Sequence, residues 1–176
     1  MNILKKLLST LVIVVGVIFI AALLMPSRFT VERETLIKSE VAPVFEQVNR
    51  IENNEKWSAW KQLDPGMVIT AGNINEGQGA SYSWKGEKTG SGALVITNSI
   101  ANERIDTEMT FEGEKEKAHG YWLFKKVSDG TLVTQGFKAR TDSLLGRLQS
   151  IFIKMFLSKQ FSKELTNIKN IVEKKE

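Results

Sequence analysis

The chain begins with a hydrophobic stretch that has the length of a membrane span. No charge occurs among the 19 residues from Leu7 to Met25. A helix over this stretch rises roughly 28 Å at about 1.5 Å per residue, close to the thickness of a hydrocarbon core. Pro26 marks its expected end. A cleaved signal peptide is the alternative, but its apolar region normally has about 7–15 residues before a small-x-small cleavage site. We therefore predict an uncleaved membrane anchor over residues 1–26 and one domain over residues 27–176.

The charges that flank this stretch bear on its orientation. Lys5, Lys6 and the amino terminus favour an N-terminus on the inner side of the membrane. Arg28, Arg33 and Lys38 lie just past the other end and nearly balance them. We expect a single-pass protein of the cell membrane with its domain on the extracytoplasmic side.

Behind the anchor, the pattern changes to short runs in which apolar and polar positions alternate, as in half-buried strands. Short connections such as Asn102-Glu103 and Asp129-Gly130 make consecutive runs antiparallel neighbours. Two short helical segments, 41–48 and 51–63, follow the first run. The strand-like runs are Phe29–Lys38, Met67–Ala71, Ala80–Trp84, Gly92–Ile100, Arg104–Phe111, Ala118–Val127 and Thr131–Ala139.

The chain ends in a long helix with two apolar stripes. The second stripe is rotated from the first, so the change of phase near 156–158 predicts a kink or a break. The first stripe contains Leu144, Leu145, Leu148, Ile151, Phe152 and Met155. The second contains Leu157, Phe161, Leu165, Ile168 and Val172.

The order of elements predicts an α+β fold. The apolar face of an antiparallel sheet must be covered, and the last helix is the only element long enough to cover it. We expect a curved antiparallel sheet of about six or seven strands wrapped around this C-terminal helix. Where the covering side chains are too small, a gap remains between sheet and helix, and this gap is the candidate site.

The run Ile151–Leu157 is apolar nearly all round and has two interpretations. Such a helix segment is usually buried in a core. The alternative is contact with the bilayer, because the domain follows its anchor directly and Lys154 can extend its ammonium group towards water.

The composition excludes several classes of site. The chain has 24 Lys and Arg against 20 Asp and Glu, one His and no Cys. Disulfides, thiolate zinc sites, cysteine nucleophiles and sites with two imidazoles are therefore excluded. Without Lys5 and Lys6 the excess of basic residues falls to two, 22 against 20, and it is not clustered. We expect no nucleic-acid partner.

Several segments resemble a known family. They are Ser27–Arg33, Val44-Phe45, Lys56–Trp60, Asp64–Met67, Gly77–Trp84, Gly90–Gly92 and the pattern of Phe161, Leu165 and Lys169. With these segments the chain resembles a membrane-anchored member of the polyketide cyclase/dehydrase-like branch of the START-related helix-grip superfamily. The likeness covers nearly the whole chain. It implies a hydrophobic cavity between the sheet and the C-terminal helix, and it carries over no catalytic residues.

The candidate ligand-binding residues are large apolar side chains on the expected inner face. Aromatic residues supply much contact area, and the polar edges of Trp and Tyr can orient a ligand. The alternative is that these side chains simply fill the core. The predicted cavity lining is Trp57, Trp60, Tyr82, Trp84, Leu94, Ile96, Met109, Phe111, Trp122, Phe124, Phe161 and Leu165.

No catalytic or metal-binding set can be named from the sequence. The alternation of its strand points His119 outward, opposite Trp122. The carboxylates are scattered without metal-ligand spacing, and we expect no metal and no cofactor. Tyr82, Thr107 and Gln135 are the only polar side chains expected to point inward.

Three functions remain open. The first is a membrane-tethered binding module for a lipid or other small hydrophobic molecule. The second is a cyclase, dehydratase or hydrolase that uses the same cavity, which requires at least two polar groups converging on the gap. The third is a scaffold in a membrane complex that binds no ligand, and a protein partner fits this function.

Overall fold

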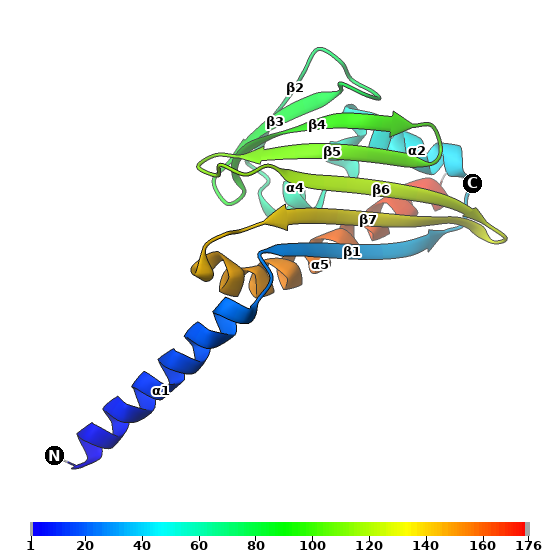
Figure 1. The fold of residues 1–176 in the computed structure, drawn as a ribbon. Coiled ribbons are helices and arrows are strands. Elements are labelled where there is room, and N and C mark those ends of the chain that lie inside the picture. The colour runs from blue at the N-terminus through cyan, green and yellow to red at the C-terminus, as the bar shows by residue number, and fades with distance from the viewer. Residues whose placement is uncertain (1, 175–176) are drawn as a thin grey trace.

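A computed structural model describes residues 2–174 and confirms the predicted fold class (Figure 1). A seven-stranded antiparallel sheet packs against a long C-terminal helix, and an apolar helix precedes the sheet. The strands are β1 (Arg28–Ile37), β2 (Val68–Ala71), β3 (Ser81–Gly86), β4 (Gly90–Ile100), β5 (Arg104–Phe111), β6 (Ala118–Val127) and β7 (Gly130–Arg140). The helices are α1 (Asn2–Leu24), α2 (Val41–Asn49), the 3₁₀ turn η1 (Ile51–Asn53), α3 (Asn54–Trp57), α4 (Ala59–Leu63) and α5 (Leu144–Glu173).

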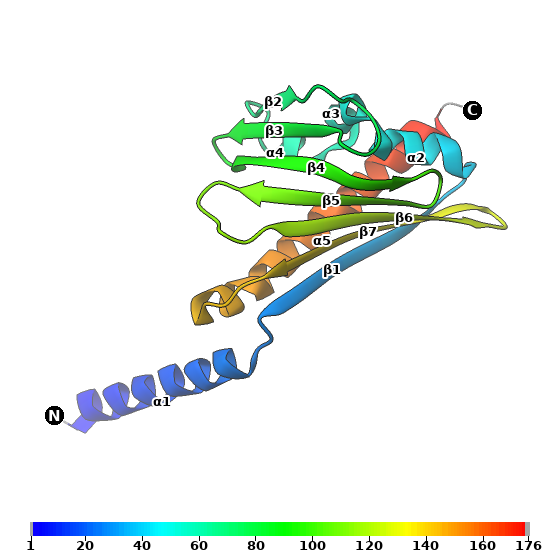
Figure 2. The same ribbon diagram turned by 45° about the horizontal axis from the view of Figure 1, so that its top comes forward.

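The sheet is a meander with one long-range pairing. Its order is β1-β7-β6-β5-β4-β3-β2, so all neighbouring strands except β1 and β7 are also consecutive in the chain. The pairing of β1 with β7 brings Val31 opposite Phe137 and Thr35 opposite Val133. This register puts the apolar residues of both strands on the inner face. Figure 2 shows α5 crossing behind the sheet. The two edge strands of the sheet are β1 and β2.

Two hydrophobic clusters form the core. The larger one joins α2, α3 and the second half of α5 to the middle of the sheet, and Leu165 and Ile168 are fully buried in it. The smaller one lies nearer to α1, around Phe29, Phe137 and Phe161. The second predicted stripe of α5 is buried throughout, as expected.

The first half of α5 departs from two expectations. The helix is uninterrupted from Leu144 to Glu173, so the predicted break is wrong. Core burial of Ile151–Leu157 is also wrong, because only Leu157 is buried and the side chain of Phe152 is 68% exposed. The physical reason is the same in both cases. The first stripe is largely exposed, so one continuous helix carries both stripes while only the second is buried.

The β6–β7 turn depends on a glycine. Gly130 has φ +137°, and a Cβ at this position would collide with the carbonyl oxygen of Ile37 in the neighbouring chain segment. We expect Gly130→Ala to destabilise the protein by about 2 kcal/mol, from backbone strain together with the collision. Urea unfolding followed by tryptophan fluorescence measures this loss.

Gly113→Ala is the control for this prediction. Gly113 also has positive φ, +85°, but no atom lies within 4 Å of a Cβ there. Its substitution introduces backbone strain alone and is expected to cost about 1 kcal/mol. Equal losses for the two variants would show that the contact with Ile37 does not restrain the turn.

Candidate functional site

The twelve side chains predicted to line a cavity fall into two groups. Six are buried in the core clusters: Trp57, Ile96, Trp122, Phe124, Phe161 and Leu165. Six are half-buried: Trp60, Tyr82, Trp84, Leu94, Met109 and Phe111. The inner face of the sheet therefore has a filled part and a half-open part.

The filled part lies between β6 and the helices α2, α3 and α5. The indole rings of Trp57 and Trp122 meet edge to face at 5.5 Å, and Phe45 meets Phe124 at 5.3 Å. Trp57 also donates a 2.8 Å hydrogen bond from Nε1 to the carbonyl oxygen of Gln47. These edge-to-face contacts are those that aromatic pairs prefer in a close-packed core.

The half-open part lies over β3, β4 and β5, with Trp60 of α4 at its border. It stays open because α5 packs mainly on β1, leaving the other end of the inner face to the short helices. The ring of Trp84 lies 6.1 Å from Tyr82 and 5.6 Å from Phe111. It rests on the backbone of Gly92, where a Cβ would collide with the indole. The result is a shallow aromatic surface with exposed area.

A buried carboxyl group lies beside this surface, and sequence reasoning missed it. Glu164 of α5 is 2% exposed. Its Oε2 accepts a 2.7 Å hydrogen bond from Nε2 of Gln135, and its Oε1 accepts a 3.2 Å bond from the Ala59 N–H. A signal was present in the sequence. Glu164 follows Leu157 by seven residues and precedes Ile168 by four, so it shares the phase of the buried stripe.

Burial changes the acidity of this group. Loss of solvation raises the pKa of Glu164 to about 7, although the hydrogen bonds from Gln135, the Ala59 N–H and Ser58 act in the opposite direction. Near neutral pH the carboxyl group can therefore both hold and release a proton. Burial, together with the nearby Glu164, also raises the pKa of Tyr82.

Of the three polar side chains expected to point inward, Gln135 contacts this carboxyl group and Tyr82 is influenced by its charge. Thr107 is buried beside Gly120 and makes no hydrogen bond to this group. Oε1 of Gln135 is buried and has no hydrogen-bond partner among the described residues. The cluster thus holds an unused acceptor next to a proton-bearing group.

Other candidates for chemistry lie elsewhere. His119 is exposed on the outer face of β6, as predicted. In the part of the chain that the structure describes, no group of three His, Asp or Glu side chains is arranged to hold a metal ion.

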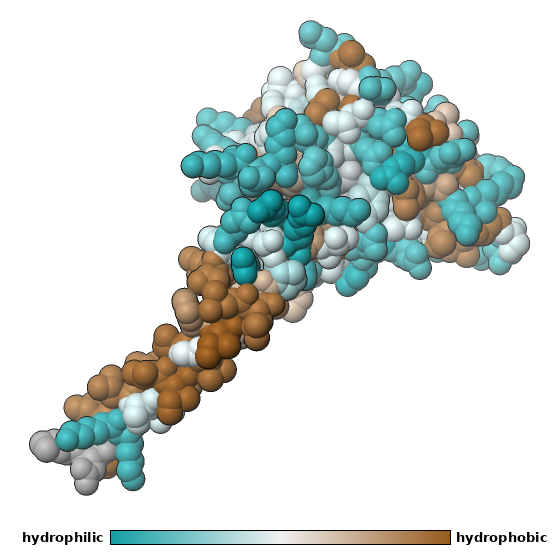
Figure 3. All heavy atoms as spheres, viewed as in Figure 1, coloured by the Kyte–Doolittle hydropathy of each residue, from teal (hydrophilic) through white to brown (hydrophobic). Residues whose placement is uncertain are grey.

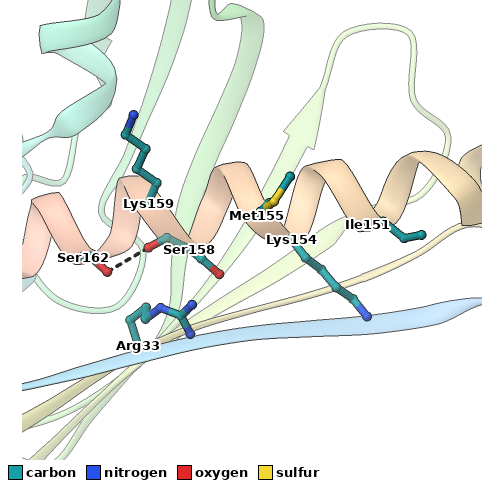
Figure 4. A pocket seen from close by; sticks show the side chains of 7 residues that line it. All are labelled: Arg33, Ile151, Lys154, Met155, Ser158, Lys159 and Ser162. Carbon is teal, nitrogen blue, oxygen red and sulfur yellow. Dashed lines mark hydrogen bonds between the residues drawn. The ribbon is translucent and has the colours of Figure 1, made fainter.

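None of the twelve predicted residues lines either of two open depressions on the surface of residues 2–174. One lies near the β6–β7 turn, around Glu40 and Asp129. The other, of about 510 Å³, lies between the edge strand β1 and α5 (Figure 4). Its lining consists of Arg33, Ile151, Lys154, Met155, Ser158, Lys159 and Ser162.

The helix α1 has the properties that its sequence predicted. Its segment Ile3–Leu24 is long and apolar enough to cross a membrane, and it is almost wholly exposed. An N-terminal signal sequence can also be this long and apolar, so these two properties are compatible with an anchor or with a signal sequence.

Comparison with solved structures establishes the fold. The di-domain ARO/CYC StfQ from the steffimycin biosynthetic pathway has a TM-score of 0.65 and 12% identity, over 84% of this chain and 51% of that one. DynU16, a putative protein in the dynemicin biosynthetic locus, has a TM-score of 0.58 and 12% identity, over 82% and 47%. SA2116 from Staphylococcus aureus, a protein of unknown function, has a TM-score of 0.66 and 13% identity, over 84% and 95%.

These likenesses show a cyclase-like helix-grip fold, and at such low identity they show the fold alone. The chain spans about half the length of StfQ and of DynU16. No protein-family model matches the sequence, and no curated protein matches it.

Proposed function

We propose that this chain is a membrane-tethered binding protein for a lipid or another small hydrophobic molecule. The observation that carries the proposal is the half-open aromatic surface formed by Trp60, Tyr82, Trp84 and Phe111. A folded domain normally covers such side chains, and apolar and aromatic side chains with a few polar groups among them are the usual lining of a ligand site. The fold shared with StfQ, an ARO/CYC protein, fits a small-molecule site at this place.

The anchor gives this site a source of ligand. In our proposal α1 remains in the membrane as a single-pass anchor, and the domain over residues 27–176 stands on the extracytoplasmic side. Hydrophobic molecules partition into the bilayer, so tethering raises their concentration at the site. Burial of about 200–300 Å² of apolar ligand surface supplies roughly 5–7 kcal/mol before the costs of binding.

The buried polar cluster gives the site a means of selection. Oε1 of Gln135 is an acceptor without a partner, and a neutral Glu164 is a donor. A ligand with a hydroxyl group at one end satisfies both, because a hydroxyl donates and accepts, whereas a carbonyl group pairs with the donor alone and a pure hydrocarbon leaves both unpaired.

A second candidate function is supported by the same cluster. An enzyme that forms or breaks bonds by proton transfer needs an acid–base group whose pKa lies near the working pH. Glu164 has such a pKa, and Gln135 and Tyr82 lie beside it. A cyclase, dehydratase or hydrolase activity therefore stays an alternative. This alternative predicts that the protein converts a substrate, and that Glu164→Gln abolishes this turnover without abolishing ligand binding.

Quenching of tryptophan fluorescence tests ligand binding at the half-open surface. All four tryptophans lie outside α1, and two of them, Trp60 and Trp84, belong to this surface. A spin-labelled fatty acid added to the full-length protein in detergent is expected to quench the fluorescence in a saturable manner. Native mass spectrometry of the protein after mild extraction is expected to show a retained lipid.

A matched pair of double variants locates the bound probe. Trp60→Phe with Trp84→Phe is expected to remove most of the quenching, whereas Trp57→Phe with Trp122→Phe, in the filled part, is expected to keep it. Equal quenching in both double variants would contradict a site at the half-open surface. Linear, unsaturable quenching together with a lipid-free mass would favour a scaffold without ligand.

A further inference from the structure

The first half of α5 carries an exposed apolar surface. Its side chains are 40–68% exposed, although each is large and hydrophobic. Phe156 contacts Trp60 of α4, and Ile151 and Met155 line a depression beside β1, but none of these side chains is buried. The members of this apolar surface are Leu145, Ile151, Phe152, Ile153, Met155 and Phe156.

This apolar surface begins where α1 ends. Nη1 of Arg147 donates 3.2 Å hydrogen bonds to the carbonyl oxygens of Leu23 and Met25, which tie the first turns of α5 to the end of α1. Ala22 is buried at the same junction. Figure 1 shows the start of α5 beside the last turn of α1, and Figure 3 shows hydrophobic colouring passing from α1 onto this end of the domain.

A cationic groove lies beside the apolar surface, between β1 and α5. Arg33, Lys154 and Lys159 line it together with the hydroxyl-bearing Ser158 and Ser162, and none of its lining residues is acidic (Figure 4). Among residues 2–174 none of the three cations forms an ion pair. Arg33 donates to the carbonyl oxygen of Glu32, and Nζ of Lys154 lies 5.9 Å from the ring centre of Phe29.

The hydroxyl groups of the groove differ in their bonding. Ser162 donates a 2.9 Å hydrogen bond to the carbonyl oxygen of Ser158. The hydroxyl of Ser158 makes no hydrogen bond to any described residue, so it is available as a donor. Three cations and a hydroxyl donor border one groove of about 510 Å³, and such groups bind the oxygens of a phosphate. In Figure 4 the side chains of Lys154 and Lys159 extend in opposite directions, so they reach a headgroup by turning towards Arg33 and Ser158.

The polarity of the groove changes along α5. Ile151 and Met155 lie at the end nearer to α1, whereas Ser158, Lys159 and Ser162 lie farther along the same helix face. An amphiphile with its acyl chains towards the anchor and its headgroup among the cations matches this order. A zwitterionic headgroup such as that of phosphatidylcholine gains less binding energy here, because its own ammonium group is repelled by the three cations.

We propose that this cationic groove binds the headgroup of an anionic phospholipid from the bilayer that holds α1, with the acyl chains along the neighbouring apolar surface. This inference rests on the membrane anchoring in our proposed function, but not on the ligand of the half-open surface. The bound phospholipid would hold α5 against the membrane and fix how the domain faces it. Phe156 also contacts Trp60, at 5.7 Å between ring centres, so the docked surface borders the half-open site.

The test uses full-length protein in nanodiscs of phosphatidylcholine with an equal share of phosphatidylglycerol. Native mass spectrometry after release reads which lipid stays bound. The groove variant is Arg33→Gln with Lys154→Gln and Lys159→Gln. The matched control is Lys85→Gln with Lys125→Gln and Lys163→Gln, which removes the same charge from exposed sites outside the groove.

The parent and the control are expected to retain phosphatidylglycerol in preference to phosphatidylcholine. The groove variant is expected to lose this preference by at least about tenfold, given a gain of about fivefold for each cation near an anionic surface. Equal retention of both lipids by the parent, or an unchanged preference in the groove variant, would overturn the proposal. A lipid-free dimer that the groove variant dissociates would overturn it too, in favour of a second copy as the occupant.

Fatty-acid quenching of Trp60 and Trp84 separates this proposal from the proposed function. Saturable quenching that persists in the groove variant shows that the half-open site is intact. If the parent protein shows no saturable quenching, the proposed function is contradicted, whereas the phospholipid site at the groove is not. The unchanged fluorescence and circular dichroism of the groove variant, whose three substitutions are at the surface, control for folding.

Discussion

At pH 8, the Glu164→Gln variant is expected to be more stable than the parent protein by about 3 kcal/mol. The reason is that the folded parent must hold an ionised carboxylate away from water at this pH. The pKa of Glu164 is about 7 in the folded protein against 4.5 as the ordinary value. Glutamine has the same shape, stays neutral, and can donate its amide hydrogen to the unpartnered Oε1 of Gln135.

The dependence on pH has a definite sign. Below pH 4.5 the carboxyl group is protonated in both the folded and the unfolded chain, so its full contribution to stability is present. Between this value and about pH 7 the folded state binds more protons, so the free energy of unfolding falls as the pH rises. In the Glu164→Gln variant no group titrates at this position, so its free energy of unfolding does not fall for this reason. The difference between variant and parent should therefore grow across this window and level off above it.

Urea unfolding of both full-length proteins in mild detergent, followed by tryptophan fluorescence between pH 4 and pH 8, measures the difference. An increase of about 3 kcal/mol corresponds to a rise in melting temperature of roughly 6–12 °C for a chain of this size. Ser150→Ala is the control, since Ser150 is a buried neutral residue of the same helix. Its stability change should not vary with pH. Parallel curves for parent and Glu164→Gln would mean that the carboxyl group is not desolvated as the structure places it.

A Val14→Lys, Ile18→Lys variant is expected to leave the membrane fraction. Both residues lie in the middle of α1 and are exposed along it. Each lysine at the centre of a span costs about 2.5–3.5 kcal/mol, so the pair costs roughly 5–7 kcal/mol. Alkaline extraction of membranes followed by immunoblotting measures the distribution. The intact mass of the parent shows at the same time whether the first 26 residues remain attached.

The control for this prediction keeps the span apolar. Val14→Leu with Ile18→Leu is expected to stay in the membrane pellet. A mass that begins after Pro26 would identify α1 as a removed signal sequence and contradict the anchor. If the double lysine variant resisted extraction, another surface would have to hold the protein, and the exposed apolar face of α5 is the first candidate.

The two predictions concern regions at opposite ends of α5. Glu164 lies in the half of α5 that is buried under the sheet, and α1 touches the half that is exposed. Between them lie the cationic groove and the contact of Phe156 with Trp60.

The sequence by itself determined the elements of this protein and their order. Apolar runs, alternation and turn residues act over a few neighbouring positions, so α1, the strands and the Asp129-Gly130 turn could be read from local pattern. The inner face of the sheet followed from the same alternation. The order of these elements predicted the fold that joins them, and the family resemblance implied the same fold.

Only the tertiary structure decided which apolar stripe of α5 is buried. Both stripes have the same local pattern, but α5 packs on β1 and covers the sheet with its second half alone. The same packing brings Glu164 to Gln135 and Arg33 to Lys154, residues far apart in the chain. Their proximity depends on the long-range pairing of β1 with β7, and no short stretch of sequence encodes the distance between two such segments.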